Sequence, residues 1–197
     1  MAVNELSRLP GVGKKTALRL ALFILKEDES FAENLGSAIV KMRKEIRFCR
    51  KCNNISDADL CEICANNKRD ENTVCVVEDT RDVLAVENTA QYNGLYHVLG
   101  GVISPMEGVG ANDLNIKHLL ERIHTEDIRE IILALPATVE GDTTSFYIYK
   151  LIKDFDVRIT TIARGVAVGE DLEYTDEITL GRSILNRLPF ENSLKRD

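Results

Sequence analysis

Four of the five cysteines lie in one short window, with the spacing Cys49-x2-Cys52-x8-Cys61-x2-Cys64. Each Cys-x-x-Cys pair can direct two thiolates at one point, and two such pairs complete the tetrahedral sulfur shell that a structural Zn²⁺ prefers. The short interval between the pairs favours a compact, closed site without an open coordination position. We therefore predict one structural zinc ion per chain, bound by these four cysteines.

The alternative use of these cysteines is two disulfides in a secreted protein. We recognise no signal peptide and no further cysteine framework in the sequence, so a zinc site is favoured. A catalytic zinc would need an open ligand position and a nearby general base, and neither is visible. No apolar run is long enough to span a membrane, so we expect a cytoplasmic protein without a membrane partner.

Charge is divided unevenly along the chain. Residues 1–70 carry 13 lysines and arginines against 10 acidic residues, whereas residues 71–197 carry 12 against 22. The formal net charge of −7 therefore hides a basic first part and an acidic second part. An acidic chain would ordinarily argue against nucleic-acid binding, but this layout leaves such a role open for the first part.

The amino-terminal segment has the pattern of a helix-hairpin-helix. Residues 4–17 read NELSRLPGVGKKTA, so a short helix bearing Leu6 and Leu9 must end before Pro10, and a second helix then continues through Leu25. Glycines without a Cβ let a DNA phosphate approach the turn, where the amides that open the second helix can bind it. The predicted DNA-binding residues are Arg8, Gly11, Gly13, Lys14, Lys15 and Arg19.

Contacts of this kind are made to the sugar–phosphate backbone, so binding should be independent of sequence and sensitive to salt. The alternative is an ordinary helical corner whose glycines only form the turn. The Leu-Pro before the glycines and the two lysines after them favour phosphate binding.

A third helix should follow, with Ser30 as its N-cap and Glu33 completing a capping box. Apolar residues at helical spacing form one stripe that we expect to be core. The stripe consists of Phe31, Leu35, Ile39, Met42 and Ile46. Residues 41–51 hold six basic side chains in eleven, which suits either a solvated helix end or a second DNA-facing surface.

The second part of the chain alternates short β-branched runs with helical segments, which predicts an α/β fold with a parallel sheet and helices on both faces. The strands are expected at residues 73–77, 96–99, 131–135 and 157–162. The helices are expected near 83–86, at 114–123, from about 143, and at 176–186. Expected caps are Asn112 or Asp113 and Thr175, and expected inward side chains are Phe146, Tyr149 and Ile152. Cys75 is read as a packed core thiol, and Glu78 ends the first strand.

This order of parts resembles the RecR family of bacterial recombination mediators, and the second part resembles a Toprim domain. The motifs that carry the resemblance are VEDTRDV at 77–83, GLYHVLGG at 94–101, TVEGD at 138–142 and DLEYTDE at 171–177. One departure is that the hairpin starts closer to the amino terminus than is usual, as if part of the first helix were missing.

The resemblance implies four parts. They are a helix-hairpin-helix DNA-binding region at 1–47, a four-cysteine zinc finger at 48–66, a Toprim domain at 72–167, and a C-terminal helix and tail at 168–197. We expect this last part to make an oligomer contact, although the apolar tail at 188–190 suits covering the chain's own core equally well.

Catalytic Toprim domains pair the strand-end glutamate with an Asp-x-Asp motif that holds Mg²⁺. Here the third strand of the sheet ends in residues 134–137, ALPA, without a carboxylate. Glu140 and Asp142 come later and could form only a weak Mg²⁺ site with Glu78. We therefore expect no enzymatic activity, and a Mg²⁺-dependent nuclease or topoisomerase-like enzyme is the alternative. The three acidic residues are better suited to docking a basic partner, or, for the last two, to stabilising a helix N-terminus.

The family further implies partners. These are DNA, single- and double-stranded and without sequence preference, then RecO, in some settings RecF, and copies of the chain itself in a homodimer or ring-like homotetramer. The implied function is to help load RecA onto single-stranded DNA coated by single-strand-binding protein. A purely structural adaptor that never touches DNA is a further alternative.

Overall fold

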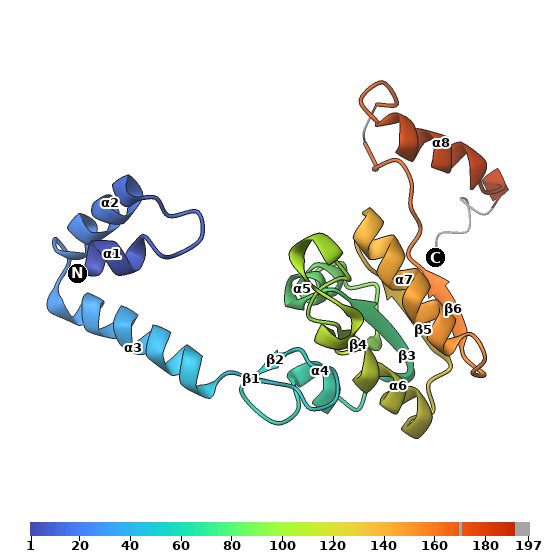
Figure 1. Cartoon of the computed structure of the whole chain (residues 1–197), viewed down its shortest axis with the longest axis horizontal. Helices are drawn as coiled ribbons and strands as arrows, with labels where there is room; N and C mark the ends of the chain where they lie inside the picture. The colour runs from blue at the N-terminus through green and yellow to red at the C-terminus, as the bar shows by residue number, and fades with distance from the viewer. Residues whose placement is uncertain (170, 192–197) are drawn as a thin grey trace. The chain divides into compact units, whose positions relative to one another are not determined.

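The computed structural model describes residues 1–169 and 171–191, and the chain divides into two compact units (Figure 1). The first unit contains residues 1–51 and 55–65, and the second contains residues 52–54 and the chain from Asn66 onward. Within the described residues, no helix has both the length and the apolar character that a membrane crossing requires.

Three helices make up most of the first unit. They are α1 (Ala2–Leu6), α2 (Lys14–Ile24) and α3 (Glu29–Glu45). Helix α1 packs against α2, and Ala17 of α2 is fully buried. The first helix ends at Leu6 rather than continuing to Leu9, because residues 7–12 form turns in which the Val12 amide donates to the Leu9 carbonyl at 3.1 Å.

Helix α3 differs from the prediction in its cap. Asp28 is the N-cap, and its carboxylate accepts a hydrogen bond from the Phe31 amide at 2.9 Å. Ser30 lies inside the first turn, where its hydroxyl donates to the same carboxylate. These bonds, from Ser30 first and then from Phe31, hold the pKa of Asp28 below its usual value. Asp28, which comes before Ser30 and can also accept hydrogen bonds from backbone amides, is thus the N-cap instead of Ser30, and the predicted capping box is not formed.

The apolar stripe of α3 is exposed, so its prediction as core is wrong for the single chain. The side chains are between 38% and 59% exposed. They are Phe31, Leu35, Ile39, Met42 and Ile46. The 3.6-residue spacing correctly predicted one apolar face, but spacing does not say which element covers that face.

The zinc-finger region is small. Strands β1 (Arg47–Phe48) and β2 (Ile55–Ser56) pair antiparallel, and helix α4 spans Glu62–Ala65. Cys49 is fully buried directly after β1.

The second unit is built on a four-stranded parallel sheet in the order β4-β3-β5-β6. Its strands are β3 (Asp70–Val77), β4 (Gly94–Val98), β5 (Glu130–Ala134) and β6 (Arg158–Thr161). All four predicted strands are present, and the sheet is parallel throughout, as expected. Among the four strands, the two central ones supply most of the buried aliphatic side chains, and the helices that cover the sheet supply the rest of the core.

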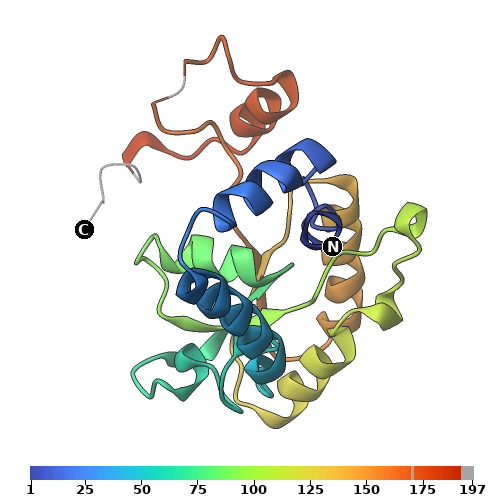
Figure 2. The same cartoon turned by 90° about the vertical axis from the view of Figure 1, so that its left-hand side faces the viewer.

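Helices α5 (Thr80–Glu87), α6 (Ile116–Thr125) and α7 (Val139–Ile152) flank this sheet (Figure 1, and turned in Figure 2). Val83, Leu119 and Ile148 are the buried anchors of the three helices. Asp79 caps α5 in a capping box with Asp82, whose carboxylate accepts from the Asp79 amide at 3.0 Å.

Several predicted helix details need correction. Asn115, not Asn112 or Asp113, is the N-cap of α6, because Ala111–Asp113 forms a separate 3₁₀ turn, η2. A second 3₁₀ turn, η1, spans Pro105–Glu107.

Helix α7 starts at Val139, capped by the Thr138 hydroxyl, rather than near residue 143. Ile152 is buried as predicted, but Phe146 and Tyr149 are 58% and 45% exposed. Ile148 and Thr144 take the inward positions instead, since the helix is rotated relative to the predicted stripe.

Helix α8 spans Glu177–Leu185. Its N-cap is Asp176, whose carboxylate accepts from the Thr179 amide at 2.9 Å. The predicted cap, Thr175, instead has a buried hydroxyl without a hydrogen-bond partner among the described residues. The predicted tail lies partly outside the described residues, since 192–197 are not among them.

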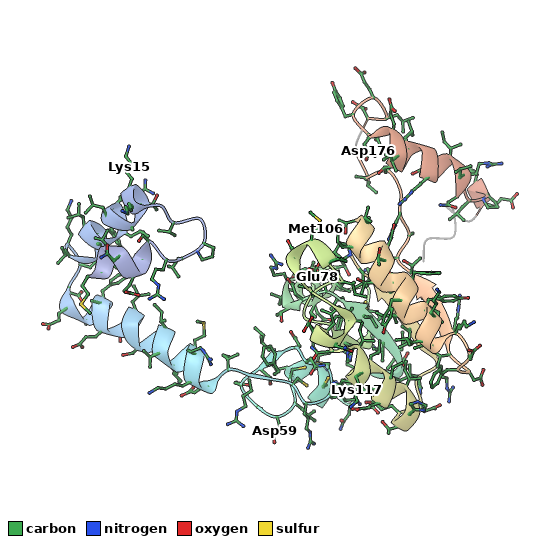
Figure 3. The ribbon with its side chains drawn as sticks, in the orientation of Figure 1. Lys15, Asp59, Glu78, Met106, Lys117 and Asp176 are labelled. Carbon is green, nitrogen blue, oxygen red and sulfur yellow. The ribbon has the colours of Figure 1, made fainter. Side chains whose placement is uncertain are left out.

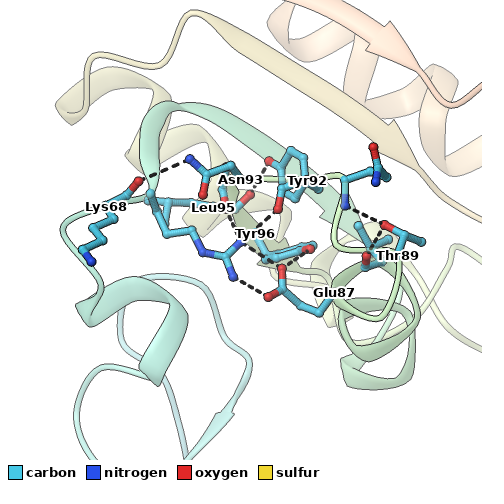
Figure 4. Close-up of polar contacts among 11 residues, drawn as sticks. Lys68, Glu87, Thr89, Tyr92, Asn93, Leu95 and Tyr96 are labelled. Atoms are coloured by element: carbon cyan, nitrogen blue, oxygen red, sulfur yellow. Dashed lines mark hydrogen bonds and ion pairs between the residues drawn. The ribbon is translucent and has the colours of Figure 1, made fainter. Parts of the chain in front are cut away.

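A polar cluster fixes the start of β3 to the start of β4 (Figure 4). Arg69 forms a bidentate ion pair with Glu87 of α5 and donates to the Tyr92 carbonyl at 3.2 Å. The Tyr96 hydroxyl donates to the Glu87 carboxylate at 2.7 Å. The Tyr92 hydroxyl donates to the Leu95 carbonyl at 2.7 Å. Arg69 and Glu87 are largely buried, so removal of either side chain would leave a poorly hydrated charge and cost more than the loss of a surface ion pair.

Candidate nucleic-acid interface and metal centre

The four cysteines predicted to bind zinc converge. The sulfur atoms of Cys49, Cys52, Cys61 and Cys64 all lie within 4.8 Å of one another, and all four residues are buried. Four tetrahedral ligands at a Zn–S distance of about 2.3 Å stand about 3.8 Å apart, so this arrangement needs little contraction to hold Zn²⁺. The donor set fits a closed structural zinc site.

Cys75 stands apart from the metal ligands, inside strand β3. Burial, and secondarily the nearby Asp82 carboxylate, raise the pKa of its thiol to about 12. The thiol is therefore neutral at physiological pH, which confirms a packed core residue rather than a nucleophile.

The second zinc ligand belongs to a segment that is attached to the Toprim-like sheet. The Val98 amide of the edge strand β4 donates to the Cys52 carbonyl at 2.8 Å. Asn53 has a left-handed backbone (φ 61°), a conformation that asparagine tolerates better than most residues, and its amide lies 2.9 Å from Nδ1 of His118. These contacts cover part of the open edge of the sheet.

A buried polar network that no sequence pattern predicted lies on the same strand, β4. His97 of β4 is fully buried, and its Nε2 donates to the Asn115 carbonyl at 2.9 Å. Its Nδ1 accepts from Arg122 at 3.3 Å, and Arg122 also donates to the Tyr96 carbonyl at 2.8 Å and pairs with Glu126. Burial, and then the Arg122 charge, lower the pKa of His97 to about 3, so the ring is neutral.

The sequence carried one signal for this network. Arg122 occupies the apolar face of α6, between Leu119 and Ile123 at helical spacing, and a charge in such a position needs a buried partner.

The hairpin between α1 and α2 is built by two glycines with different roles. Gly11 has φ +77°, a left-handed conformation that favours glycine. Gly13 is the extended N-cap of α2 and makes no side-chain cap. A Cβ at either position would meet nothing within 4 Å, so open space lies in front of the turn.

The start of α2 presents unpaired donors. The first intrahelical hydrogen bond runs from the Ala17 amide to the Gly13 carbonyl at 2.9 Å. The amides of Lys14, Lys15 and Thr16 precede this bond, so the helix provides no acceptor for them. No acidic residue lies in the first turn. Among the described residues no side-chain carboxylate caps this helix start, so the positive end of the helix dipole is available to an anion.

The predicted cations surround this helix start to different degrees. Lys14, Lys15 and Arg19 are exposed and form no ion pair with any described residue, and Lys15 extends away from α2 (Figure 3). Arg8 instead pairs with Glu5 at 2.8 Å on the surface, a weak interaction that a phosphate can replace. Lys15 and Arg19 also border a shallow hollow of about 430 Å³ on α2.

Of the predicted acidic residues, Glu78 lies half-buried at the carboxyl end of β3 (Figure 3). Burial first, and then the charges of Asp82 and Asp79, raise the pKa of Glu78, while Arg81 opposes them. Asp142 pairs with Arg164 at 2.6 Å, and this bond lowers the pKa of Asp142. The two carboxylates therefore sit in opposite electrostatic surroundings.

The end of β5, where a catalytic Toprim domain places its aspartates, is closed by the start of α7. A Cβ on Gly141 would lie 2.0 Å from the Pro136 carbonyl oxygen, so the helix rests directly on the strand exit. Within residues 1–169 and 171–191, the four cysteines form the one group of three or more potential metal ligands that the structure brings together. Glu78, Glu140 and Asp142 do not form such a group there.

The fold and the site define a Toprim-domain protein that also carries a hairpin of two helices and a four-cysteine zinc site. Models of protein families match the same parts: a Toprim domain at residues 72–163, the RecR helix-hairpin-helix at 2–43, the RecR four-cysteine zinc finger domain at 46–66 and the RecR C-terminal region at 165–188.

Curated relatives extend this match over the whole chain. The sequence is 58% identical to the recombination protein RecR of Flavobacterium johnsoniae, over 100% of this chain and 95% of the relative. It is 56% identical to that of Parabacteroides distasonis, over 96% and 91%, and 55% identical to that of Bacteroides thetaiotaomicron, over 98% and 94%. The chain belongs to the RecR family, and the resemblance predicted from its motifs is confirmed.

Proposed function

We propose that this protein is a DNA-binding recombination mediator that works in recombinational repair and catalyses no reaction itself. The observation that carries the proposal is the start of α2, where free backbone amides, an open glycine turn and unpaired cations meet. Such a helix N-terminus binds phosphate oxygens regardless of base sequence. Single- and double-stranded DNA are therefore both ligands of the hairpin.

We assign DNA contacts to the residues predicted from the sequence: Arg8, Gly11, Gly13, Lys14, Lys15 and Arg19. We also keep the division into a DNA-binding region (1–47), a zinc finger (48–66), a Toprim domain (72–167) and a C-terminal part (168–197) as the working description of the chain. Zinc supports the fold, and the place of action is the cytoplasm.

Self-association follows from the small number of contacts that one hairpin can make. One or two phosphate contacts give little affinity at cellular salt, whereas several linked hairpins raise it through effective concentration. The exposed stripe of α3 supports an interface between copies, since apolar faces of this kind are normally covered. A homodimer or ring-like homotetramer is the proposed form.

The acidic residues of the second unit are proposed to dock basic partners. Family membership supports RecO, and in some settings RecF, as these partners, with loading of RecA onto coated single-stranded DNA as the outcome. Glu78 is the best placed of the three, because it is half-exposed at a strand end beside Asp79 and Asp82. Asp142 is already engaged by Arg164, so it contributes less.

The end of β5 supports the absence of catalysis. The strand exit holds Leu135 and Pro136 where catalytic members carry carboxylates, and Gly141 packs against it. A nuclease or topoisomerase-like activity would require Mg²⁺-dependent DNA cleavage that Glu78→Gln abolishes.

Charge reversal tests the DNA-binding proposal. Lys15→Glu combined with Arg19→Glu should weaken binding to single- and double-stranded DNA roughly tenfold or more and flatten the salt dependence, because two phosphate contacts are lost. Fluorescence anisotropy with labelled DNA at several salt concentrations measures this. Lys117→Glu, at an exposed position on α6, is the matched control and should have little effect (Figure 3). Unchanged affinity of the folded double variant would reject the proposal.

A further inference from the structure

One aromatic side chain stands out on the zinc-finger hairpin. Phe48 of β1 is 73% exposed, and its cross-strand partner Ile55 of β2 is 47% exposed. The next residue, Cys49, is a fully buried zinc ligand. The backbone at Phe48 is thus held by strand pairing on one side and by the metal site on the other, while its ring faces solvent.

The other aromatic rings of the first unit are engaged with each other. Phe23 and Phe31 meet edge to face, with ring centroids 6.0 Å apart and planes at 85°. Phe48 is the third aromatic residue of this unit and has no ring partner among the described residues. Its ring is both the most exposed and the one available for stacking.

Cations flank this ring along the chain. Arg43 and Lys44 lie in the last turn of α3, and Arg50 follows Phe48 by two residues. The side chains of these three residues form no ion pair with a described residue. Arg47 pairs with Asp59 at 3.4 Å, but both side chains are mostly exposed, so the pair is weak and a phosphate can compete for the arginine.

We propose that Phe48 is a stacking platform for an unpaired base of single-stranded DNA, with the neighbouring arginines and Lys44 holding the phosphates on either side. An exposed ring on a rigid support, flanked by cations, is the combination that binds single strands, because every base offers a face and every nucleotide a charge. Because the neighbouring side chains are positively charged, the ligand should be a polyanion. Because the exposed ring can stack on a base, this polyanion should be a nucleic acid with unpaired bases, which a duplex does not have.

This inference rests on the proposed DNA-binding function and deepens it. The α2 hairpin binds phosphates of either DNA form, whereas the Phe48 platform adds affinity for single strands alone. The two sites together give the protein a preference for single-stranded DNA that phosphate contacts by themselves do not provide.

Removal of the ring tests the platform in the full-length, zinc-loaded protein. Phe48→Ala should weaken binding to a labelled thymidine oligonucleotide by roughly 5- to 150-fold, the range that loss of one stacked base produces. Binding to a duplex of the same length should stay within about twofold, since no stacked base is lost there. Phe48→Tyr keeps the ring and should bind single strands like the unsubstituted protein.

A tryptophan reporter tests stacking directly, because the chain contains no tryptophan. Phe48→Trp should place an indole at the platform, and its fluorescence should be quenched by the oligonucleotide and much less by the duplex. Phe146→Trp, at an exposed position of α7 in the other unit, is the control and should show no comparable quenching.

The outcomes separate this proposal from the one on which it rests. If the unsubstituted protein binds neither DNA form, the DNA-binding function itself fails. If it binds both forms and Phe48→Ala changes neither affinity, or changes both equally, only the platform is rejected. A Phe48→Ala variant with altered mass in light scattering and unaltered single-strand affinity would instead identify Phe48 as a protein contact and also reject the platform.

Discussion

At the scale of single residues, glycine is required at different positions for different reasons. Gly11 needs its left-handed backbone, Gly13 leaves space in front of a helix start, and Gly141 permits contact between α7 and the exit of β5. Sequence patterns singled out the first two, since they form a recognisable Gly-x-Gly turn. For Gly141 the sequence indicated only that it belongs to a motif. Its close contact with the Pro136 carbonyl could not be predicted, because the fold brings these two residues together.

Gly141→Ala should therefore destabilise the protein by about 1–3 kcal/mol, because a Cβ 2.0 Å from the Pro136 carbonyl oxygen forces the helix to move. Thermal unfolding followed by circular dichroism measures the loss. Gly36→Ala is the matched control, since Gly36 also lies within a helix but has nothing within 4 Å. It should be neutral or stabilising by up to about 1 kcal/mol. A Gly141→Ala protein as stable as the control would contradict the close packing.

His97 should give the folded state a defined pH dependence. The pKa of His97 is about 3 in the folded protein and 6.5 in the unfolded chain. Between these pH values the unfolded chain therefore binds a proton at His97 and the native state does not. The contribution of His97 to the free energy of unfolding is complete above pH 6.5 and is lost as the pH falls. The free energy of unfolding should therefore decrease by about 1.4 kcal/mol between pH 7.5 and 5.5. The direct measurement is the NMR shift of the His97 ring, which should not change between pH 5 and 7. Titration near pH 6.5 would contradict a buried neutral ring.

At the scale of helices and strands, the sequence predicted what depends on local pattern and failed where the answer depends on neighbours. The four strands and their parallel order follow from alternating β-branched runs and helical segments, and the structure confirms them. The α3 face was predicted correctly as apolar and wrongly as core, because periodicity does not identify a covering element. Two of the three cap errors, at α3 and α8, arose where two nearby residues can cap the helix and the aspartate does so, whereas the error at α6 arose from a separate 3₁₀ turn.

The parts of the candidate site also differ in how well the sequence predicted them. The four zinc ligands lie at short spacing, so the local sequence was enough to predict that they lie together in the structure. The acidic trio joins segments far apart in the chain, and the described structure does not bring its members together as a group of metal ligands. Asp142 pairs with Arg164 instead. The network of His97 and Arg122 joins β4 to α6, a pairing that no local pattern specifies.

At the scale of the whole molecule, self-association determines whether several weakly binding hairpins together give a useful affinity for DNA. The α3 stripe offers Ile39 and Met42 at 55% and 59% exposure, and burial of such side chains between copies would stabilise an oligomer. Ile39→Asp with Met42→Asp should therefore lower the mass measured by light scattering and weaken DNA binding at the same time, because avidity is lost with the partner copies. Met106→Asp, at a position 96% exposed in the second unit, should change neither. A smaller particle with undiminished DNA affinity would show that one hairpin suffices, whereas an unchanged mass would place the interface between copies on another surface.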